Sequence, residues 1–158
     1  MNIYLIRHSE AEPVSSQVRD FDRNLTVQGE ESLRKAADGW KKLISQFDFI
    51  VSSPLNRALQ TAEIIKEGFK TKSEIIIDKK VVGGTTKEIL EIAFALDGKE
   101  IAFCGHEPTM SNYLSEMTCS GNLYLSFRKA MIAKIHFDGR PRLGAGELEF
   151  LIPAKAYK

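Results

Sequence analysis

The sequence is poor in cysteine, in long apolar runs and in net charge, and each shortage excludes a class of protein. Its two cysteines, Cys104 and Cys119, are too few for a disulfide scaffold and match no zinc-binding spacing. No apolar run approaches the roughly 20 residues of a membrane span, and no basic-then-apolar start suggests a signal peptide. With 22 Lys+Arg against 21 Asp+Glu, no global field favours nucleic acid or an anionic membrane. A reduced, cytoplasmic setting is the simplest expectation.

What is present is typical of one globular domain, expected to span residues 1–158. The chain is 43% hydrophobic and 27% charged, and its length suffices for a single sizeable core. We see no internal repeat, low-complexity tract or linker that would divide it.

Strand-like and helix-like segments alternate through the first 120 residues. Short apolar runs predict strands at 3–6, 48–52, 74–77 and 100–104. Apolar residues three and four apart predict a helix that starts near Thr26 and continues to Phe47. Further helix starts are indicated by Ser53-Pro54 as N-cap and first helical residue, by a Thr85–Glu88 capping box, and by Pro108. This βαβαβαβα order favours a parallel sheet with helices on both faces.

The tail changes character. Residues 131–137 alternate between apolar and more polar positions, a break follows at Gly139 and Pro141, and residues 146–152 form a further strand-like run. We expect a hairpin or antiparallel edge strands. The predicted fold class is therefore α/β: a three-layer α/β/α sandwich with a mostly parallel central sheet and antiparallel C-terminal strands.

Four cationic or titratable residues lie where predicted strands end or where a predicted helix begins. Arg7 and His8 end the first strand, Arg57 lies in the first turn of the second helix, and His106 follows the fourth strand. In a parallel α/β sheet all of these positions share the carboxyl edge, where ligands bind. Taken singly, Arg7-His8 reads as a solvent-facing strand end. Arg57, a cation at the positive end of a helix, fits either an anion site or surface variation. Together they predict a site for a dianion such as phosphate, which arginine binds through its planar fork.

Four segments carry a family resemblance. Residues 7–11 (RHSEA), 23–29 (RNLTVQG), 53–61 (SPLNRALQT) and 105–108 (GHEP) resemble the histidine phosphatase superfamily, the phosphoglycerate-mutase-like clan. The short chain and the Arg-Asn-Leu-Thr segment are most similar to its SixA-type phosphohistidine phosphatases. The resemblance covers about residues 1–120.

The resemblance implies a covalent mechanism without metal or cofactor. His8 would attack phosphorus and form a phosphohistidine that water then hydrolyses. Arg7, Arg57 and His106 would hold the phosphoryl oxygens and stabilise their charge. Arg23 would orient the phosphoryl group or the substrate, with a surface position as the alternative.

Two departures from the family pattern bear on the substrate. Ser9 replaces the usual Gly after Arg-His; it is small enough to be tolerated, and we place it beside Arg23 among the substrate-binding residues. The larger members also carry an acid after the third strand that protonates the leaving oxygen. Here only Asp78 is available, and a strand-end role suits it equally; Glu10 and Glu107 are other loop acids. A weak proton donor suits phosphohistidine, whose imidazole leaves easily.

The expected partner is therefore a phosphorylated protein, such as a histidine phosphotransfer domain in a signalling relay. Three alternatives stay open: a phosphatase of small sugar or nucleotide phosphates, a mutase, and a catalytically weak domain that only binds phosphorylated ligands. The short chain argues against a mutase, and the presence of His8 argues against pure binding.

Overall fold

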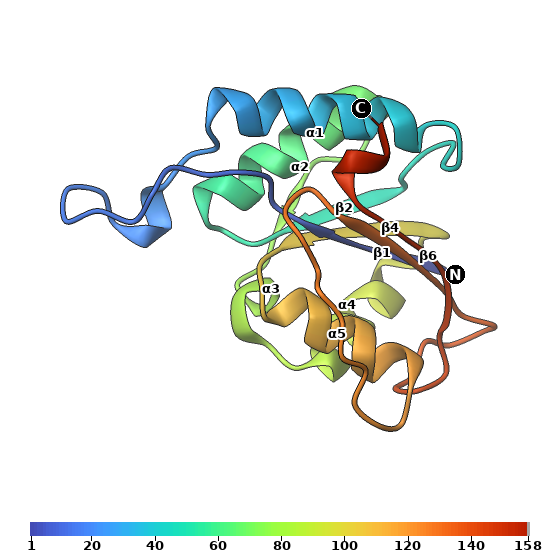
Figure 1. Cartoon of the computed structure of the whole chain (residues 1–158). Coiled ribbons are helices and arrows are strands. Elements are labelled where there is room, and N and C mark those ends of the chain that lie inside the picture. Colours follow the sequence, from blue (N-terminus) through green and yellow to red (C-terminus); the bar gives the residue numbers. More distant parts are fainter. Residues whose placement is uncertain (158) are drawn as a thin grey trace.

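The computed structural model describes residues 1–157, which form a six-stranded sheet with helices on both faces (Figure 1). The sheet order is β3-β2-β4-β1-β5-β6. Strands β1 to β4 run parallel, β5 is antiparallel to β1, and β6 is antiparallel to β5. The strands are β1 (Asn2–Arg7), β2 (Phe49–Ser52), β3 (Ile76–Ile77), β4 (Glu100–Gly105), β5 (Ile132–His136) and β6 (Glu147–Ile152). The predicted three-layer fold, including its antiparallel C-terminal strands, is confirmed.

The helices divide between the two faces of the sheet and bury a separate hydrophobic cluster on each. They are α1 (Val27–Trp40), α2 (Asn56–Phe69), α3 (Lys80–Gly83), α4 (Thr86–Leu96) and α5 (Thr109–Thr118), with 3-10 turns η1 (Asp20–Asp22) and η2 (Ala154–Tyr157). Helices α1 and α2 cover one face, and α3 to α5 cover the other (Figure 1). None of the helices in residues 1–157 combines the length and apolarity needed to cross a membrane.

Strand β1 shows why the sequence selects a buried parallel sheet. Ile3 and Leu5 join the cluster beneath α4 and α5, whereas Tyr4 and Ile6 join the cluster beneath α1 and α2. All four side chains are at most 1% exposed. A strand covered on both faces reads as a continuous apolar run, and its first polar residues appear only where it leaves the sheet. The parallel strands therefore deliver their polar ends to one edge.

The first helix is shorter than its apolar periodicity predicts. It ends at Trp40, and a turn follows in which the Lys41 N–H bonds back to carbonyls of the last helical turn. Ile44 and Phe47 are still buried, at 3% each, because the chain folds back onto the same cluster. The apolar periodicity therefore predicted correctly that Ile44 and Phe47 are buried, but it predicted a helix that is longer than α1.

The start of the second helix was also wrongly predicted. Leu55, not Ser53, is the N-cap of α2, so Pro54 lies before the helix. Pro108 is likewise the N-cap of α5 and not its first residue. In contrast, the Thr85–Glu88 capping box is confirmed, with the Glu88 N–H donating to Thr85 Oγ1 at 3.3 Å and the Thr85 N–H donating to Glu88 Oε2 at 2.9 Å. The Ser53 hydroxyl instead contacts a histidine ring, that of His106.

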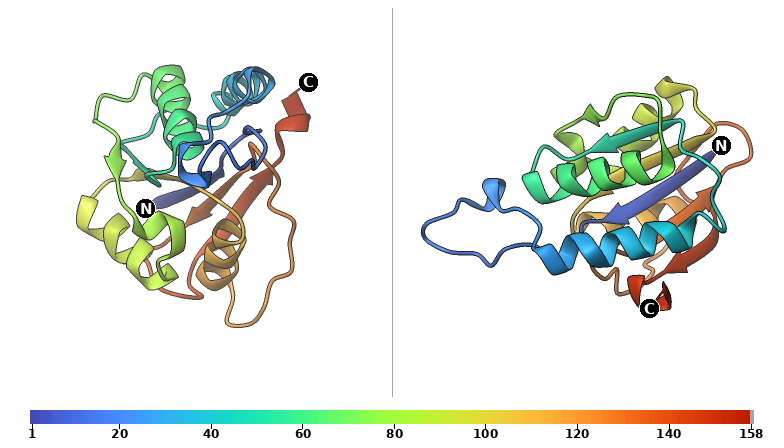
Figure 2. Two further views of the ribbon diagram at one scale, coloured as in Figure 1. Left: turned by 90° about the vertical axis from the view of Figure 1, so that its left-hand side faces the viewer. Right: turned by 90° about the horizontal axis from the view of Figure 1, so that it is seen from above.

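The segment between β1 and α1 extends away from the body of the molecule as an arm (Figure 2). It carries η1 and returns to the sheet edge at Thr26, which caps α1 by accepting the Gly29 N–H at 3.0 Å. The arm therefore begins and ends beside the carboxyl edge of the parallel strands.

Candidate active site

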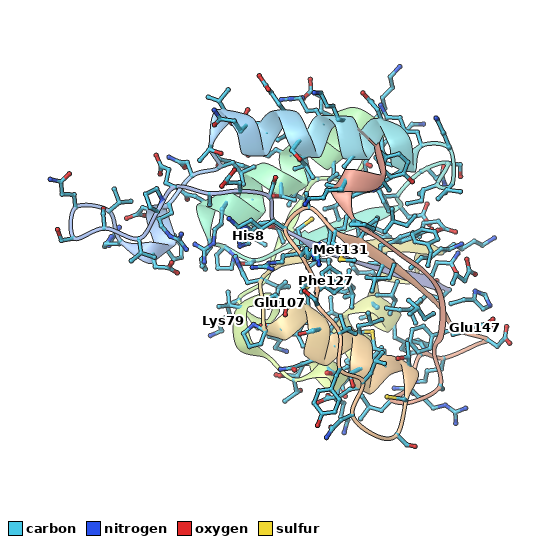
Figure 3. The ribbon with its side chains drawn as sticks, viewed as in Figure 1. His8, Lys79, Glu107, Phe127, Met131 and Glu147 are labelled. Carbon is cyan, nitrogen blue, oxygen red and sulfur yellow. The ribbon has the colours of Figure 1, made fainter. Side chains whose placement is uncertain are left out.

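The carboxyl edge of the sheet brings together the four residues that the sequence placed there. Arg7 ends β1 opposite Gly105, the last residue of β4, and the His8 N–H donates to the Gly105 carbonyl at 3.0 Å. The rings of His8 and His106 lie 5.1 Å apart between centroids. His8, Arg57 and His106 are all buried. Figure 3 shows His8 at this end of the sheet and Glu147 at the other.

The His8 ring is held in one orientation by its neighbour's backbone. His8 Nδ1 lies 2.6 Å from the Ser9 carbonyl oxygen. Because a carbonyl can only accept a hydrogen bond, Nδ1 must carry the hydrogen. The other nitrogen, Nε2, then keeps its lone pair, which is the state that a nucleophilic imidazole requires.

Burial and surrounding cations keep both histidines neutral at physiological pH. Desolvation lowers the pKa of His8 to about 4, and the charges of Arg57, Arg7 and Arg23 act in the same direction. Desolvation likewise lowers the pKa of His106 to about 3, with further contributions from His8 and Arg57. A buried imidazole among guanidinium groups resists protonation until an anion arrives. The site therefore has excess positive charge from arginine and a neutral nucleophile.

The two arginines are positioned by backbone carbonyls and retain unused donors. Arg7 Nη1 donates to the Phe127 carbonyl at 2.7 Å, and Arg57 Nη1 donates to the Asp20 carbonyl at 2.7 Å. The Nε atoms of both arginines are buried without a partner in residues 1–157. Buried unpaired donors are costly unless a ligand uses them. This pattern is typical of a prepared anion site.

Ser53 orients the second histidine. Its hydroxyl lies 2.7 Å from His106 Nε2 and also accepts the Leu55 N–H at 3.2 Å. His106 Nδ1 is buried without a partner in the described part of the chain. When the Ser53 hydroxyl donates to Nε2, Nδ1 carries a hydrogen and becomes a further free donor. The sequence had marked Ser53 only as a helix cap.

Asp20 joins two arginines and was missed by sequence reasoning. Its Oδ2 accepts from Arg57 Nη2 at 3.1 Å, and its Oδ1 accepts from Arg23 Nη2 at 2.7 Å. Desolvation acts to raise the pKa of Asp20, but the hydrogen bonds from Arg23 and Arg57 outweigh it and lower the pKa. The carboxylate thus ties the arm to the site. Its spacing of three residues before Arg23 was the one available signal.

Arg23 lies at the rim of the site, and its hydrogen bonds go to two residues of the arm, Asp20 and Glu12. Its Nη1 donates to the Glu12 carbonyl at 2.7 Å, and its side chain is 15% exposed. The structure connects it to Arg57 only through Asp20. Its role in orienting substrate stays a prediction.

The backbone around Ser9 is fixed by the start of α1. The Thr26 N–H donates to the Glu10 carbonyl at 3.0 Å. A Cβ on Gly29 would lie 2.2 Å from that same carbonyl oxygen, so only glycine allows the helix to approach this closely. Ser9 itself is 2% exposed, and its demonstrated contribution is the carbonyl that orients His8. A role of its side chain in substrate binding stays a prediction.

The three acids that the sequence offered as proton donors have other contacts. Asp78 Oδ1 accepts the Lys80 N–H at 2.9 Å, which is a strand-end capping role. Glu107 accepts from the Ser111 N–H at 3.0 Å and from its hydroxyl at 2.7 Å. Glu10 is 57% exposed in its side chain and lies 3.8 Å from Lys129 Nζ. None of these contacts directs a carboxyl group at His8 or His106.

The donor set suits an oxyanion better than a metal cation. Among residues 1–157, no three His, Cys, Asp or Glu side chains are grouped so that they would hold a metal ion. Arg7, Arg57 and His106 instead each keep a buried nitrogen without a partner in residues 1–157. Such a set binds a group with several anionic oxygens.

Comparisons with known proteins agree with this geometry. The family model of the histidine phosphatase superfamily (branch 1) matches residues 3–82. A phosphohistidine phosphatase SixA homolog of Haemophilus influenzae is 29% identical over 150 residues, covering 88% of this chain and 90% of that protein. An uncharacterized Picosynechococcus protein is 40% identical over 65 residues, 41% of this chain but only 39% of that protein. Among solved structures, the protein histidine phosphatase SixA complexed with tungstate superimposes with a TM-score of 0.88 at 22% identity, covering 100% of both chains.

Proposed function

The chain belongs to the histidine phosphatase superfamily, and we propose that it hydrolyses phosphohistidine in proteins through a covalent intermediate on His8. The observation that carries the proposal is the His8 Nδ1 contact with the Ser9 carbonyl, which leaves Nε2 with a free lone pair on a buried ring close to the charges of Arg57 and Arg7. The similarity to a SixA homolog and to the SixA fold supports the substrate class.

The reaction has two displacement steps. In the first, the His8 Nε2 lone pair forms a bond to phosphorus, and the bond from phosphorus to the substrate nitrogen breaks. The leaving imidazole keeps that electron pair and binds a proton. In the second, a water oxygen attacks phosphorus, the bond to His8 Nε2 breaks, and inorganic phosphate leaves with a proton released to solvent. Arg7, Arg57 and His106 hold the oxygens throughout.

The contacts of the nearby acids favour phosphohistidine over alkyl phosphates. An alkoxide needs a proton as it leaves, whereas an imidazole titrates near pH 6.5 and leaves readily. The carboxylates of Asp78 and Glu107 both accept hydrogen bonds from nearby residues. We also infer a reducing, cytoplasmic setting, because Cys104 and Cys119 are both unpaired thiols.

A substrate panel tests the proposal. A phosphohistidine peptide, an aryl phosphate and a sugar phosphate are compared by kcat/KM, with and without a chelator. We expect the order phosphohistidine, aryl, sugar, with the sugar phosphate slowest by at least about 10²-fold, the scale of general-acid catalysis. The chelator should have no effect. Equal rates on all three would show a proton donor and assign the enzyme to small phosphate esters. Binding without turnover would leave a phospho-ligand-binding domain.

A further inference from the structure

A cavity of about 350 Å³ opens beside Arg7, on the side of the sheet edge away from Arg57, and it is lined mainly by cations. Its residues are Arg7, Arg128, Lys129, Pro153, Ala154 and Lys155. Arg128, Lys129 and Lys155 are exposed. We refer to these three residues as the basic rim.

The topology explains why the basic rim lies next to Arg7 and His8, which we refer to as the catalytic pair. Strand β6 is antiparallel to β5, which is antiparallel to β1, so β6 ends at the same edge as β1. Lys155 follows that end. The segment before β5 is hydrogen-bonded to the catalytic pair: the Arg7 N–H donates to the Met131 carbonyl at 3.1 Å, and the Ala130 N–H donates to the His8 carbonyl at 3.2 Å. Figure 3 shows Met131 and Phe127 close to His8.

The charges of the basic rim are largely unneutralised. In residues 1–157, Arg128 and Lys155 form no salt bridge, and Lys129 has only the distant contact with Glu10 at 3.8 Å. The acids elsewhere on this edge are already engaged, Asp20 by two arginines and Glu107 by Ser111. The basic rim is therefore a positively charged surface beside the phosphoryl site, and apart from the distant Glu10 no acidic residue in residues 1–157 neutralises it.

We propose that the basic rim binds carboxylates on the surface of the phosphoprotein substrate, next to its phosphohistidine. The inference rests on the proposed function and names the partner's chemistry: an acidic surface around the phosphorylated residue. The three cations come from two separate segments and are long and exposed. That arrangement suits several carboxylates spread over a protein surface, which charge complementarity steers into place. A second phosphate on a small substrate would share this charge, and the test separates the two.

The probes are two synthetic phosphohistidine peptides of equal length, one flanked by glutamates and one by glutamines. The measured quantity is the ratio of their kcat/KM values, so each protein serves as its own folding control. For the unmodified protein we expect the glutamate peptide to be preferred by about tenfold, since exposed ion pairs are weak singly and add over three contacts. The preference should shrink as salt is raised.

The variant Arg128→Glu/Lys129→Glu/Lys155→Glu should lose the preference, giving a ratio near one or below. The matched control is Lys42→Glu/Lys70→Glu/Lys72→Glu, which changes the net charge equally. These exposed lysines follow the C-terminal ends of α1 and α2, away from the carboxyl edge. The control should keep the preference.

Several outcomes would overturn the inference. A ratio near one in the unmodified protein, with both peptides hydrolysed, removes the acidic partner but leaves the phosphohistidine activity. A preference that survives in the basic-rim variant places the selectivity elsewhere. Failure to hydrolyse either peptide, with an aryl phosphate still cleaved, overturns the proposed function and the inference together. The unmodified protein could instead prefer a sugar bisphosphate to its monophosphate, and lose that preference in the basic-rim variant. That result would assign the basic rim to small substrates.

Discussion

The cavity beside α4 and the carboxyl edge of the sheet both carry cationic side chains, but only the carboxyl edge holds such a side chain buried. The cavity between α4 and the β5–β6 loop measures about 500 Å³ and is lined by Lys87, Arg140 and Arg142 together with Glu91 and apolar residues. All three are exposed, and Arg140 stacks over the Phe94 ring at 4.5 Å. At the carboxyl edge, by contrast, Arg57 is buried and its Nε has no partner in residues 1–157.

The contrast shows that volume and charge alone do not make a catalytic site. A cation in water is already solvated and gains little from binding a phosphoryl group. A buried donor without a partner has already lost its water during folding. It therefore gains the full hydrogen-bond energy when an oxyanion binds. Substitutions at the carboxyl edge should therefore cost far more activity than substitutions in the exposed cavity.

The substitution His8→Ala should lower kcat/KM by at least about 10³-fold, because it removes the nucleophile and with it the covalent route. The matched control is His136→Ala, on β5, which should change activity by less than about twofold. Quenching the unmodified protein with labelled substrate should trap an acid-labile, alkali-stable phosphoryl group on His8. Full activity in the alanine variant would contradict the covalent scheme.

The substitution Arg57→Ala should lower kcat/KM by about 10²–10³-fold, the cost of removing one oxyanion donor. Arg140→Ala removes an arginine side chain from the cavity between α4 and the β5–β6 loop. It should lower kcat/KM by less than about twofold. The pair tests the comparison directly with steady-state kinetics. A loss below about threefold for Arg57→Ala, or equal losses for the two variants, would show that burial does not distinguish these regions.

The substitution Asp20→Asn should lower activity by about tenfold, mainly in kcat, because Arg57 and Arg23 lose their shared anchor while the Asp20 carbonyl still holds Arg57. Asp22→Asn is the control, since Asp22 pairs with Arg19 on the exposed part of the arm. A rise in activity would mean instead that the Asp20 carboxylate competes with the phosphoryl group for the arginines.

The sequence sufficed to place Arg7, His8, Arg57 and His106 at one edge of the sheet because each follows a strong local pattern. Arg7 and His8 end an apolar run, His106 follows another, and Arg57 opens an amphipathic helix. Parallel strands share their carboxyl edge, so these local positions imply that the side chains lie close together. The fold class followed from the same alternation.

Asp20 and Ser53 escaped prediction because their contacts depend on long-range geometry. Asp20 reaches Arg57 across 37 positions of sequence through a turn in the arm, and no periodicity encodes that path. Ser53 carried a helix-cap signal that was locally reasonable, yet its hydroxyl pairs with His106 across 53 positions. The end of α1 at Trp40 was missed for a related reason, because burial continues after the helix stops.

The smallest expected effect concerns pH and again follows from burial. An imidazole with the ordinary pKa near 6.5 would be about 90% protonated at pH 5.5 and would lose roughly tenfold as a nucleophile. Burial lowers the pKa of His8 to about 4, so its neutral form should persist at pH 5.5 and disappear only as the pH falls through about 4.

Nuclear magnetic resonance of histidine-labelled protein without substrate can follow this titration, with the His8 signal assigned by its absence in His8→Asn. Saturating phosphate should move the midpoint upward, because the dianion offsets the arginine charges that favour the neutral ring. A midpoint near 6.5 without phosphate would mean that His8 is solvated like a surface histidine, and the distinction between the two regions would fail at its central residue.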